Sequence, residues 1–225
     1  MSTPLDNPIW NSLSSRHAYL AKAVGRAKMY PGEVAPFAGI PDTSEASVRD
    51  LLDLVQVQER VGILNVHPGS WEGWEVQKSF DIAQYAWDEK SGSPEPEPDA
   101  EPLNAAHLPQ MLELTALVYP AYFRKGTAEL GDYFGIIQDD QLCAMAGIRM
   151  ALEGHQEISA VCTHPDHRGK GYASRLTKHL VHYIQGQGDI AFLHTESDNS
   201  VARRIYEGIG FQLRAMLPFF IVERC

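Results

Sequence analysis

The stretch HPDHRGKGYASRL occupies residues 164–176 and contains two glycines, a proline and three basic residues. It follows EISAVCT (157–163), which is typical of a strand, and runs into an apolar stripe of period 3.6 that indicates a helix from Tyr172. The first turn of a helix has unpaired N–H groups, and glycines let a ligand approach the backbone closely. The stretch therefore predicts an anion site, to which Arg168 and Lys170 add positive charge.

Other interpretations of this loop are a plain helix-start turn and two familiar nucleotide loops. The pattern GxxxxGK[ST] is absent, because no hydroxyl residue follows Lys170 and no earlier glycine has the right spacing. A GxGxxG dinucleotide loop would need glycine where Ser174 stands and an acid at the end of the next strand, for which Glu196 is a loose match. The plain turn stays open on this motif alone.

Composition limits the class of protein and its partners. The chain has 225 residues, enough for one large domain or two small ones, and its apolar content of 44% is ordinary for a globular protein. The formal net charge of −10 argues against nucleic-acid binding and favours cationic small molecules or peptides.

Cysteine usage and the first residues indicate the compartment. Cys143, Cys162 and Cys225 form no CxxC pair, which favours free thiols in a reducing environment. The opening MSTPLDNPIW lacks the regions of a signal peptide, and no apolar run approaches the roughly 20 residues of a membrane span. We expect a cytoplasmic protein without a membrane partner.

A proline-rich and acidic segment, SGSPEPEPDAEP at 91–102, predicts a linker, because alternating proline and acid form neither a helix nor a central strand. It separates an N-terminal α/β region of uncertain fold (1–90) from a second domain (103–225). In the first part, residues 10–30 have helical spacing and 75–87 look like a strand. We hypothesise that this part packs on the second domain and walls an acceptor pocket.

The second part predicts a mixed α/β fold. Helices are expected at 105–118, from Tyr172, and at 198–210, where Asp198 or Asn199 is the N-cap. Strands are expected at 133–138, 142–150, 157–163, 189–195, 211–216 and 217–224. A strand before the first of these helices is either very short or supplied by the N-terminal half.

Two motifs in this part resemble the GNAT family of N-acetyltransferases. Arg168, Gly171 and Ala173 match the pattern Arg/Gln-x-x-Gly-x-Gly/Ala. DNSVARRIYEGIGF matches N-x-x-A-x-x-x-Y-x-x-x-G-F through Asn199, Ala202, Tyr206, Gly210 and Phe211. The resemblance covers about residues 104–224 and implies a mostly antiparallel mixed sheet flanked by helices, with the N-terminal half as an extension or a degenerate second domain.

The resemblance implies acetyl-CoA as co-substrate, and no metal is expected, because the sequence supplies no ligand set at regular spacing. Backbone N–H groups of 169–174 would hold the pyrophosphate, the strand edge would pair with pantetheine, and one N–H near Val161 or Cys162 would polarise the thioester. The residues expected at the cofactor are Val161, Cys162, Thr163, Arg168, Gly169, Lys170, Gly171, Tyr172, Ala173, Ser174, Asn199, Ala202 and Arg203.

The resemblance also implies N-acetyl transfer, by direct attack in a ternary complex, to a primary amine of a small molecule, amino acid or peptide. Tyr206 would protonate the leaving thiolate, and Glu157 would act as general base, directly or through water. His194 and Glu196 stay open as alternative bases. An acyl-enzyme on Cys162 is not favoured by the family pattern.

Other features leave alternatives open. The histidine pairs 164/167 and 179/182 have i,i+3 spacing but no further metal ligands at regular spacing. Trp71 and Trp74 are more typical of packing than of binding. A second hypothesis is a catalytically weak GNAT-like module that binds CoA or a partner and regulates. The acceptor pocket would involve residues 119–126 and the surroundings of Met150 and Phe219, and the oligomeric state is open, a homodimer included.

Overall fold

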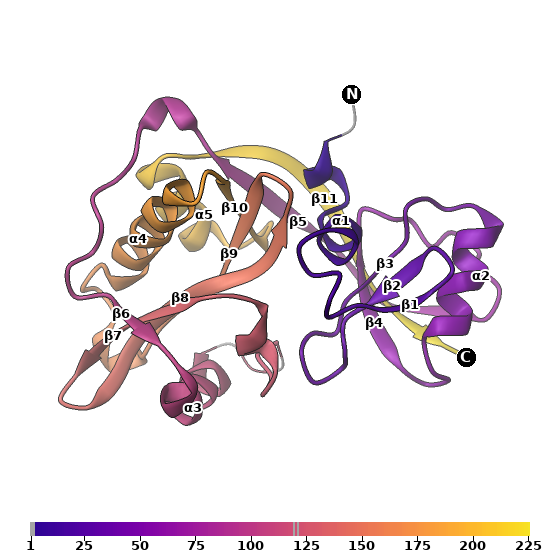
Figure 1. The fold of residues 1–225 in the computed structure, drawn as a ribbon, viewed down its shortest axis with the longest axis horizontal. Helices are drawn as coiled ribbons and strands as arrows, with labels where there is room; N and C mark the ends of the chain where they lie inside the picture. Colours follow the sequence, from indigo (N-terminus) through magenta and orange to yellow (C-terminus); the bar gives the residue numbers. More distant parts are fainter. Residues whose placement is uncertain (1–2, 119, 121) are drawn as a thin grey trace.

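Figure 1 shows the fold in a computed structural model, which describes residues 3–118, 120 and 122–225. The strands are β1 (Lys22–Val24), β2 (Ala27–Met29), β3 (Ala38–Gly39), β4 (Arg60–Leu64), β5 (Trp74–Trp87), β6 (Glu101–Leu103), β7 (Tyr133–Gln138), β8 (Gln141–Leu152), β9 (His155–Thr163), β10 (Ile190–Glu196) and β11 (Phe211–Arg224). The α-helices are α1 (Pro8–Ser14), α2 (Glu45–Leu54), α3 (Leu108–Val118), α4 (Tyr172–Gly186) and α5 (Ser200–Ile209).

The main sheet has eight strands in the order β4-β11-β5-β10-β9-β8-β7-β6, and β1, β2 and β3 form a smaller sheet. Neighbours in the main sheet are antiparallel except β9 and β10, which are parallel. The fold is therefore the mixed, mostly antiparallel α/β arrangement expected from the sequence.

Strand β5 comes from the N-terminal half, yet it lies between β10 and β11. In Figure 1, β5 and β11 run side by side from the part that carries α4 and α5 to the part that carries α2. The expected strand before α3 is the three-residue β6, at the edge of the sheet. Strands from both sides of residues 91–102 thus share one sheet, while the division of the chain into two domains stays a prediction.

Helices cover both faces of the main sheet. In β10, Ala191 and Leu193 belong to the apolar cluster with α4 and α5, whereas Phe192 belongs to the cluster with α1. This alternation is the period-2 pattern of a strand buried on both faces. Burial of a Leu or Phe side chain, as at Leu193 and Phe192, contributes about 1.5–3 kcal/mol through removal of apolar surface from water. Helix α3 packs through Met111 and Leu114 on its own cluster.

Helix α4 begins at Tyr172, as the sequence predicts, and α5 lies within the predicted range 198–210. Asn199 is the N-cap of α5, and its side chain accepts the Ala202 N–H at 3.0 Å. Gly210 ends α5 with φ +119, a left-handed conformation that favours glycine. A Cβ there would lie 2.9 Å from the Trp87 ring, so the close approach of this ring also requires glycine.

Two predicted elements differ from the structure. The helical spacing in 10–30 continues only through α1, which ends at Ser14; the chain then turns and forms the β1–β2 hairpin around Gly25, whose φ is +52. The two strands expected at 211–216 and 217–224 are the single strand β11, with a bulge between Leu213 and Ala215. Pro218 is tolerated there because it lies just beyond the last β11–β4 pair, at Phe219.

Among the described residues, no helix has both the length and the apolar character that crossing a bilayer requires.

Candidate active site

The glycine loop lies on the surface between β9 and α4. Gly169 and Gly171 have φ +78 and +75, and a Cβ built on either would meet no atom within 4 Å. No packing contact therefore explains the glycines; the left-handed backbone does, and the space above them is open to a ligand. Gly171 is the N-cap of the 15-residue helix α4, and no side chain caps its first turn. The loop thus fits the phosphate of a bound cofactor.

The side chains around this loop divide into two groups. Arg168 and Lys170 are exposed, as an anion site on the surface requires. Tyr172 is buried in the core beneath α4, so only its backbone can reach a ligand at the loop. Ala173 and Ser174 are half-buried in the first turn of α4.

Strands β9 and β10 separate at a bulge. Their parallel pairing covers only 155–158 with 190–193. Beyond it, Ala160 has φ +52 and the β8–β9 register shifts between Met145 and Gly147. A bulge bends its strand and leaves one residue unpaired. The bulge therefore turns the end of β9 away from β10 and opens the sheet between them.

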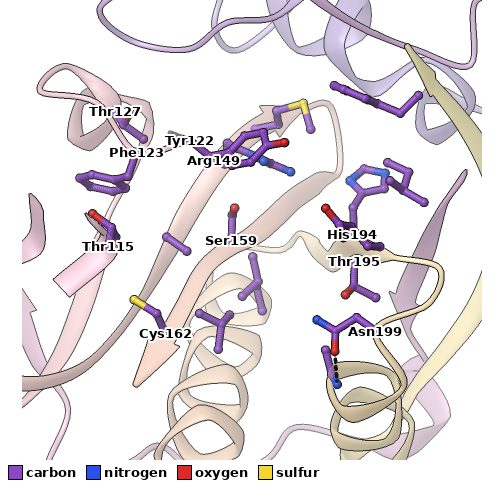
Figure 2. Close-up of a pocket in the computed structure, with 18 of the residues that line it drawn as sticks. Thr115, Tyr122, Phe123, Thr127, Arg149, Ser159, Cys162, His194, Thr195 and Asn199 are labelled. Carbon is purple, nitrogen blue, oxygen red and sulfur yellow. Dashed lines mark hydrogen bonds between the residues drawn. The ribbon is translucent and has the colours of Figure 1, made fainter. Parts of the chain in front are cut away.

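A cavity of about 340 Å³ lies at this opening. Figure 2 shows Ser159 and Cys162 of β9 on one side of it, and His194, Thr195 and Asn199 on the other. Of the predicted site residues, the cavity is lined by Val161, Cys162, Asn199, Ala202 and Tyr206. Asn199, Ala202 and Tyr206 thus form one face of the α5 region, as their helical spacing predicts.

Thr163 and Arg203 are not among the residues that line this cavity. Arg203 donates from Nε to the Tyr85 hydroxyl and from Nη1 to the Ser197 carbonyl, each at 3.0 Å. Its guanidinium is therefore engaged with β5 and with the loop before α5. Contact of Thr163 and Arg203 with a cofactor stays a prediction.

Glu157 is fully buried and does not line the cavity. Its carboxylate accepts two hydrogen bonds from Arg149, at 2.8 Å from Nε and 2.5 Å from Nη2, and one from His194 Nδ1 at 2.7 Å. Burial alone would raise the pKa of Glu157, but the charge and the hydrogen bonds of Arg149, with the hydrogen bond from His194, lower it to about 2. A carboxylate held in this way is a weak base at neutral pH, so the geometry disfavours Glu157 as the general base.

His194 is held through both ring nitrogens. Its Nδ1 faces Glu157, and its Nε2 lies 3.0 Å from Nε2 of Gln84. Gln84 in turn donates to the Leu5 carbonyl and accepts a 2.7 Å bond from Arg214 at Oε1, which fixes the orientation of its amide. The amide nitrogen therefore donates to His194, whose Nε2 accepts while Nδ1 carries the proton.

Comparison with known proteins identifies the domain. Residues 133–218 match the model of the family described as FR47-like protein. Residues 133–218 are thus an FR47-like, GNAT-type domain. A GNAT-family protein from Novosphingobium aromaticivorans is similar over 100% of both chains, with TM-score 0.90 and 28% identity. The placement supports acyl transfer as the general class of reaction.

More distant solved structures share the fold over most of the chain, the N-terminal half included. A GCN5-related N-acetyltransferase from Kribbella flavida aligns with TM-score 0.62 and 15% identity, over 96% of this chain and 95% of that chain. A GNAT-family acetyltransferase from Colwellia psychrerythraea aligns with TM-score 0.55 and 15% identity, over 89% of this chain and 81% of that chain. A search of the curated proteins finds no match.

The structure disfavours an acyl-enzyme on Cys162. Burial raises the pKa of the Cys162 thiol to about 12, so the thiol is neutral and a poor nucleophile at neutral pH.

The histidine pair 179/182 contacts the segment 91–102. His179 Nδ1 accepts the Glu97 N–H, and His182 Nδ1 lies 3.1 Å from the Pro94 carbonyl, so this pair holds the segment against α4. Within the described part of the chain, no group of three or more metal-binding side chains occurs.

Sequence reasoning missed several side chains that shape this site. Arg149 is the one charged residue in the apolar run LCAMAGIRMAL, and Gln84 is the one amide in DIAQYAW. A polar side chain among apolar ones in a strand buried on both faces needs a hydrogen-bonding partner inside the protein. This pattern could have indicated that Arg149 and Gln84 belong to a buried polar network. Of the predicted acceptor loop, Tyr122 and Phe123 line the cavity, while residues 119 and 121 lie outside the described part.

Proposed function

We propose that this protein transfers an acetyl group from acetyl-CoA to a primary amine of a small molecule, amino acid or peptide. The observation that supports this most is the cavity between the bulged end of β9 and the end of β10, with the Tyr206 face of α5 beside it. The glycine loop follows β9 directly, so a ligand held there can extend into the cavity.

Acetyl-CoA supplies the activated acetyl thioester. In this proposal the backbone of 169–174 binds the pyrophosphate, and the exposed Arg168 and Lys170 add charge. Val161 and Cys162 at the unpaired edge of β9 bind the pantetheine arm, opposite Asn199 and Ala202.

The proposed reaction is a direct attack. The amine nitrogen forms a bond to the thioester carbon, the carbon–sulfur bond breaks, and the nitrogen loses one proton while the leaving sulfur gains one. A backbone N–H at the β9 bulge polarises the carbonyl oxygen. Tyr206 is the proposed proton donor, because it lines the cavity and its ring is held between Tyr85 and Phe211, at centroid distances of 6.4 and 6.2 Å.

Glu157 has a positioning role in this proposal. It is sealed from the cavity, and it fixes Arg149 and His194, both of which line the cavity. Glu196, at the end of β10, is the one carboxylate among the described lining residues and is the better candidate for the base.

The test measures CoA release and acetylated product with a panel of amines, together with the acetyl-CoA dissociation constant. Tyr206→Phe should lower kcat by roughly 10²–10⁴-fold, the usual contribution of a proton-transfer residue, and should leave acetyl-CoA affinity unchanged. Tyr183→Phe is the matched control, since Tyr183 binds Asp132 away from the cavity and should retain activity.

Two results would overturn this proposal. If acetyl-CoA binds but no amine in the panel yields CoA and acetylated product, the binding-module hypothesis replaces it. If Tyr206→Phe is as active as the native protein, another group protonates the thiolate.

A further inference from the structure

We infer that the acceptor is a small primary amine that carries an aromatic or branched apolar group, and that Phe37, Phe80 and Phe219 hold this group. The inference rests on the proposed function, because it names the class of acceptor for the same cavity. It depends on how the N-terminal half contributes to the cavity wall.

The acceptor side of the cavity is apolar. Sheet order places β5 and β11 on the opposite side of β10 from the β9 bulge, so side chains from these strands lie across the cavity from the thioester. The apolar lining on this side consists of Ile9, Phe37, Leu64, Phe80, Ile82 and Phe219. Of these, only Phe219 comes from the C-terminal half of the chain.

Three of these side chains form an aromatic cluster. The Phe219 ring lies 6.1 Å from Phe37, edge to face, and 5.3 Å from Phe80. These separations fall within the range at which aromatic pairs attract. Gly62 makes the arrangement possible: a Cβ there would lie 2.5 Å from the Phe219 ring and 3.0 Å from Phe37. Glycine at this position of β4 therefore leaves the space that the Phe219 and Phe37 rings occupy.

The charges around the cavity disfavour a polycationic acceptor. Arg149 lies 5.3 Å from the centre of the Phe37 ring, and the Lys78 ammonium lies 4.6 Å from that of Phe80. Two cationic side chains therefore lie next to the aromatic cluster, one of them paired with Glu157, and a second ammonium of a polyamine would gain no attraction there. Among the described lining residues Glu196 is the only carboxylate, enough for one ammonium.

The size of the cavity favours a small acceptor. Its volume of about 340 Å³ is near the lower end of typical ligand pockets, which run from about 300 to 1,000 Å³. Part of this volume must hold the acetyl end of the co-substrate. The remainder suits one amine with a ring or branched chain.

The experiment compares phenethylamine, ethanolamine and spermidine as acceptors for the full chain. Calorimetry with saturating CoA gives the affinity for each amine without turnover, and CoA release from acetyl-CoA gives kcat/KM. We expect phenethylamine to exceed the other two by roughly tenfold or more in both measurements, because an apolar pocket discriminates by at least this factor per group.

Two variants locate the preference. Phe80→Leu should lower kcat/KM for phenethylamine by roughly tenfold and leave ethanolamine unchanged. Phe134→Leu is the matched control, because Phe134 packs against His179 and Tyr183 outside the cavity. This variant should leave kcat/KM unchanged for all three amines. Unchanged acetyl-CoA affinity in Phe80→Leu would show that the variant is folded.

The failure of this inference differs from the failure of the proposed function. If ethanolamine or spermidine is the better acceptor, or if Phe80→Leu lowers kcat/KM equally for all three amines, the inference is overturned and acetyl transfer stands. If no amine releases CoA, the proposed function fails, and the calorimetry still decides whether the cavity prefers the apolar amine.

Discussion

The Arg149 guanidinium forms a two-point ion pair with the buried carboxylate of Glu157, through Nε–Oε2 at 2.8 Å and Nη2–Oε1 at 2.5 Å. The Glu157 side chain has no exposed surface, so its charge depends on this partner and on His194. The pair joins β8 to β9 directly beside the bulge, and it connects the candidate site to the stability of the fold.

Removal of Arg149 should therefore be costly. Arg149→Ala leaves a buried carboxylate without its main partner, and we expect a loss of roughly 3–5 kcal/mol in the free energy of unfolding, measured with urea. Arg60→Ala is the control, because the Arg60–Glu223 pair is a surface contact with Arg60 63% exposed, and its loss should cost roughly 0–1 kcal/mol. Similar losses for the two variants would show that the buried pair contributes no more than a surface pair.

The pH dependence of catalysis distinguishes the two roles considered for Glu157. Because the pKa of this carboxyl is lowered to about 2, its titration lies below the range in which the enzyme would be assayed. Glu157→Gln should then lower kcat/KM by displacing Arg149 and His194, and should leave the apparent pKa of the acidic limb of the pH–rate profile unchanged. If this limb disappears in Glu157→Gln and is retained in Glu196→Gln, Glu157 is the base.

His17 predicts how folding stability depends on pH. It is buried against the Tyr30 hydroxyl, and burial, reinforced by the charge of Arg16, lowers the pKa of His17 to about 4. The unfolded chain therefore binds a proton at His17 more tightly than the folded chain does. The contribution of neutral His17 to folding stability is fully present above pH 6.5 and is lost as pH falls toward 4. The loss from this group amounts to roughly 3 kcal/mol.

Urea unfolding at several pH values measures this effect. His17→Gln should flatten the decline in stability between pH 6.5 and 4, whereas His67→Gln, at an exposed histidine, should leave it unchanged. Parallel curves for the native protein and His17→Gln would contradict the assignment.

Local signals in the sequence were enough to predict the elements that build the cofactor side. The apolar stripe after Gly171 and the Asn199 cap predicted α4 and α5, because caps and periodicity depend on neighbouring residues. They could not predict that β5 lies between β10 and β11, since strand partners are chosen by contacts distant in the chain. The spacing through Leu20 and Val24 predicted a longer helix, and the turn at Gly25 with the β1–β2 pairing overrode it.

The acceptor side was beyond prediction for the same reason. Phe37, Phe80 and Phe219 are far apart in the sequence. Phe80 and Phe219 meet through the β5–β11 pairing, and Phe37 joins them through its bridge to Gly62 of β4. Glu157 was chosen as the base from its position relative to Arg168, but the role of a carboxylate depends on its partners, and Arg149 becomes one only when β8 and β9 pair.

The affinity for acetyl-CoA in two glycine variants tests the central claim most directly. Gly171 in the loop and Gly154 in the β8–β9 turn have φ +75 and +71, and a Cβ on either meets no atom within 4 Å. Valine at the two sites therefore imposes the same kind of backbone strain, and only Gly171→Val places a side chain in the proposed pyrophosphate site. Calorimetry should show acetyl-CoA binding weakened at least tenfold in Gly171→Val and unchanged in Gly154→Val. Equal, native affinity in both variants would contradict the account.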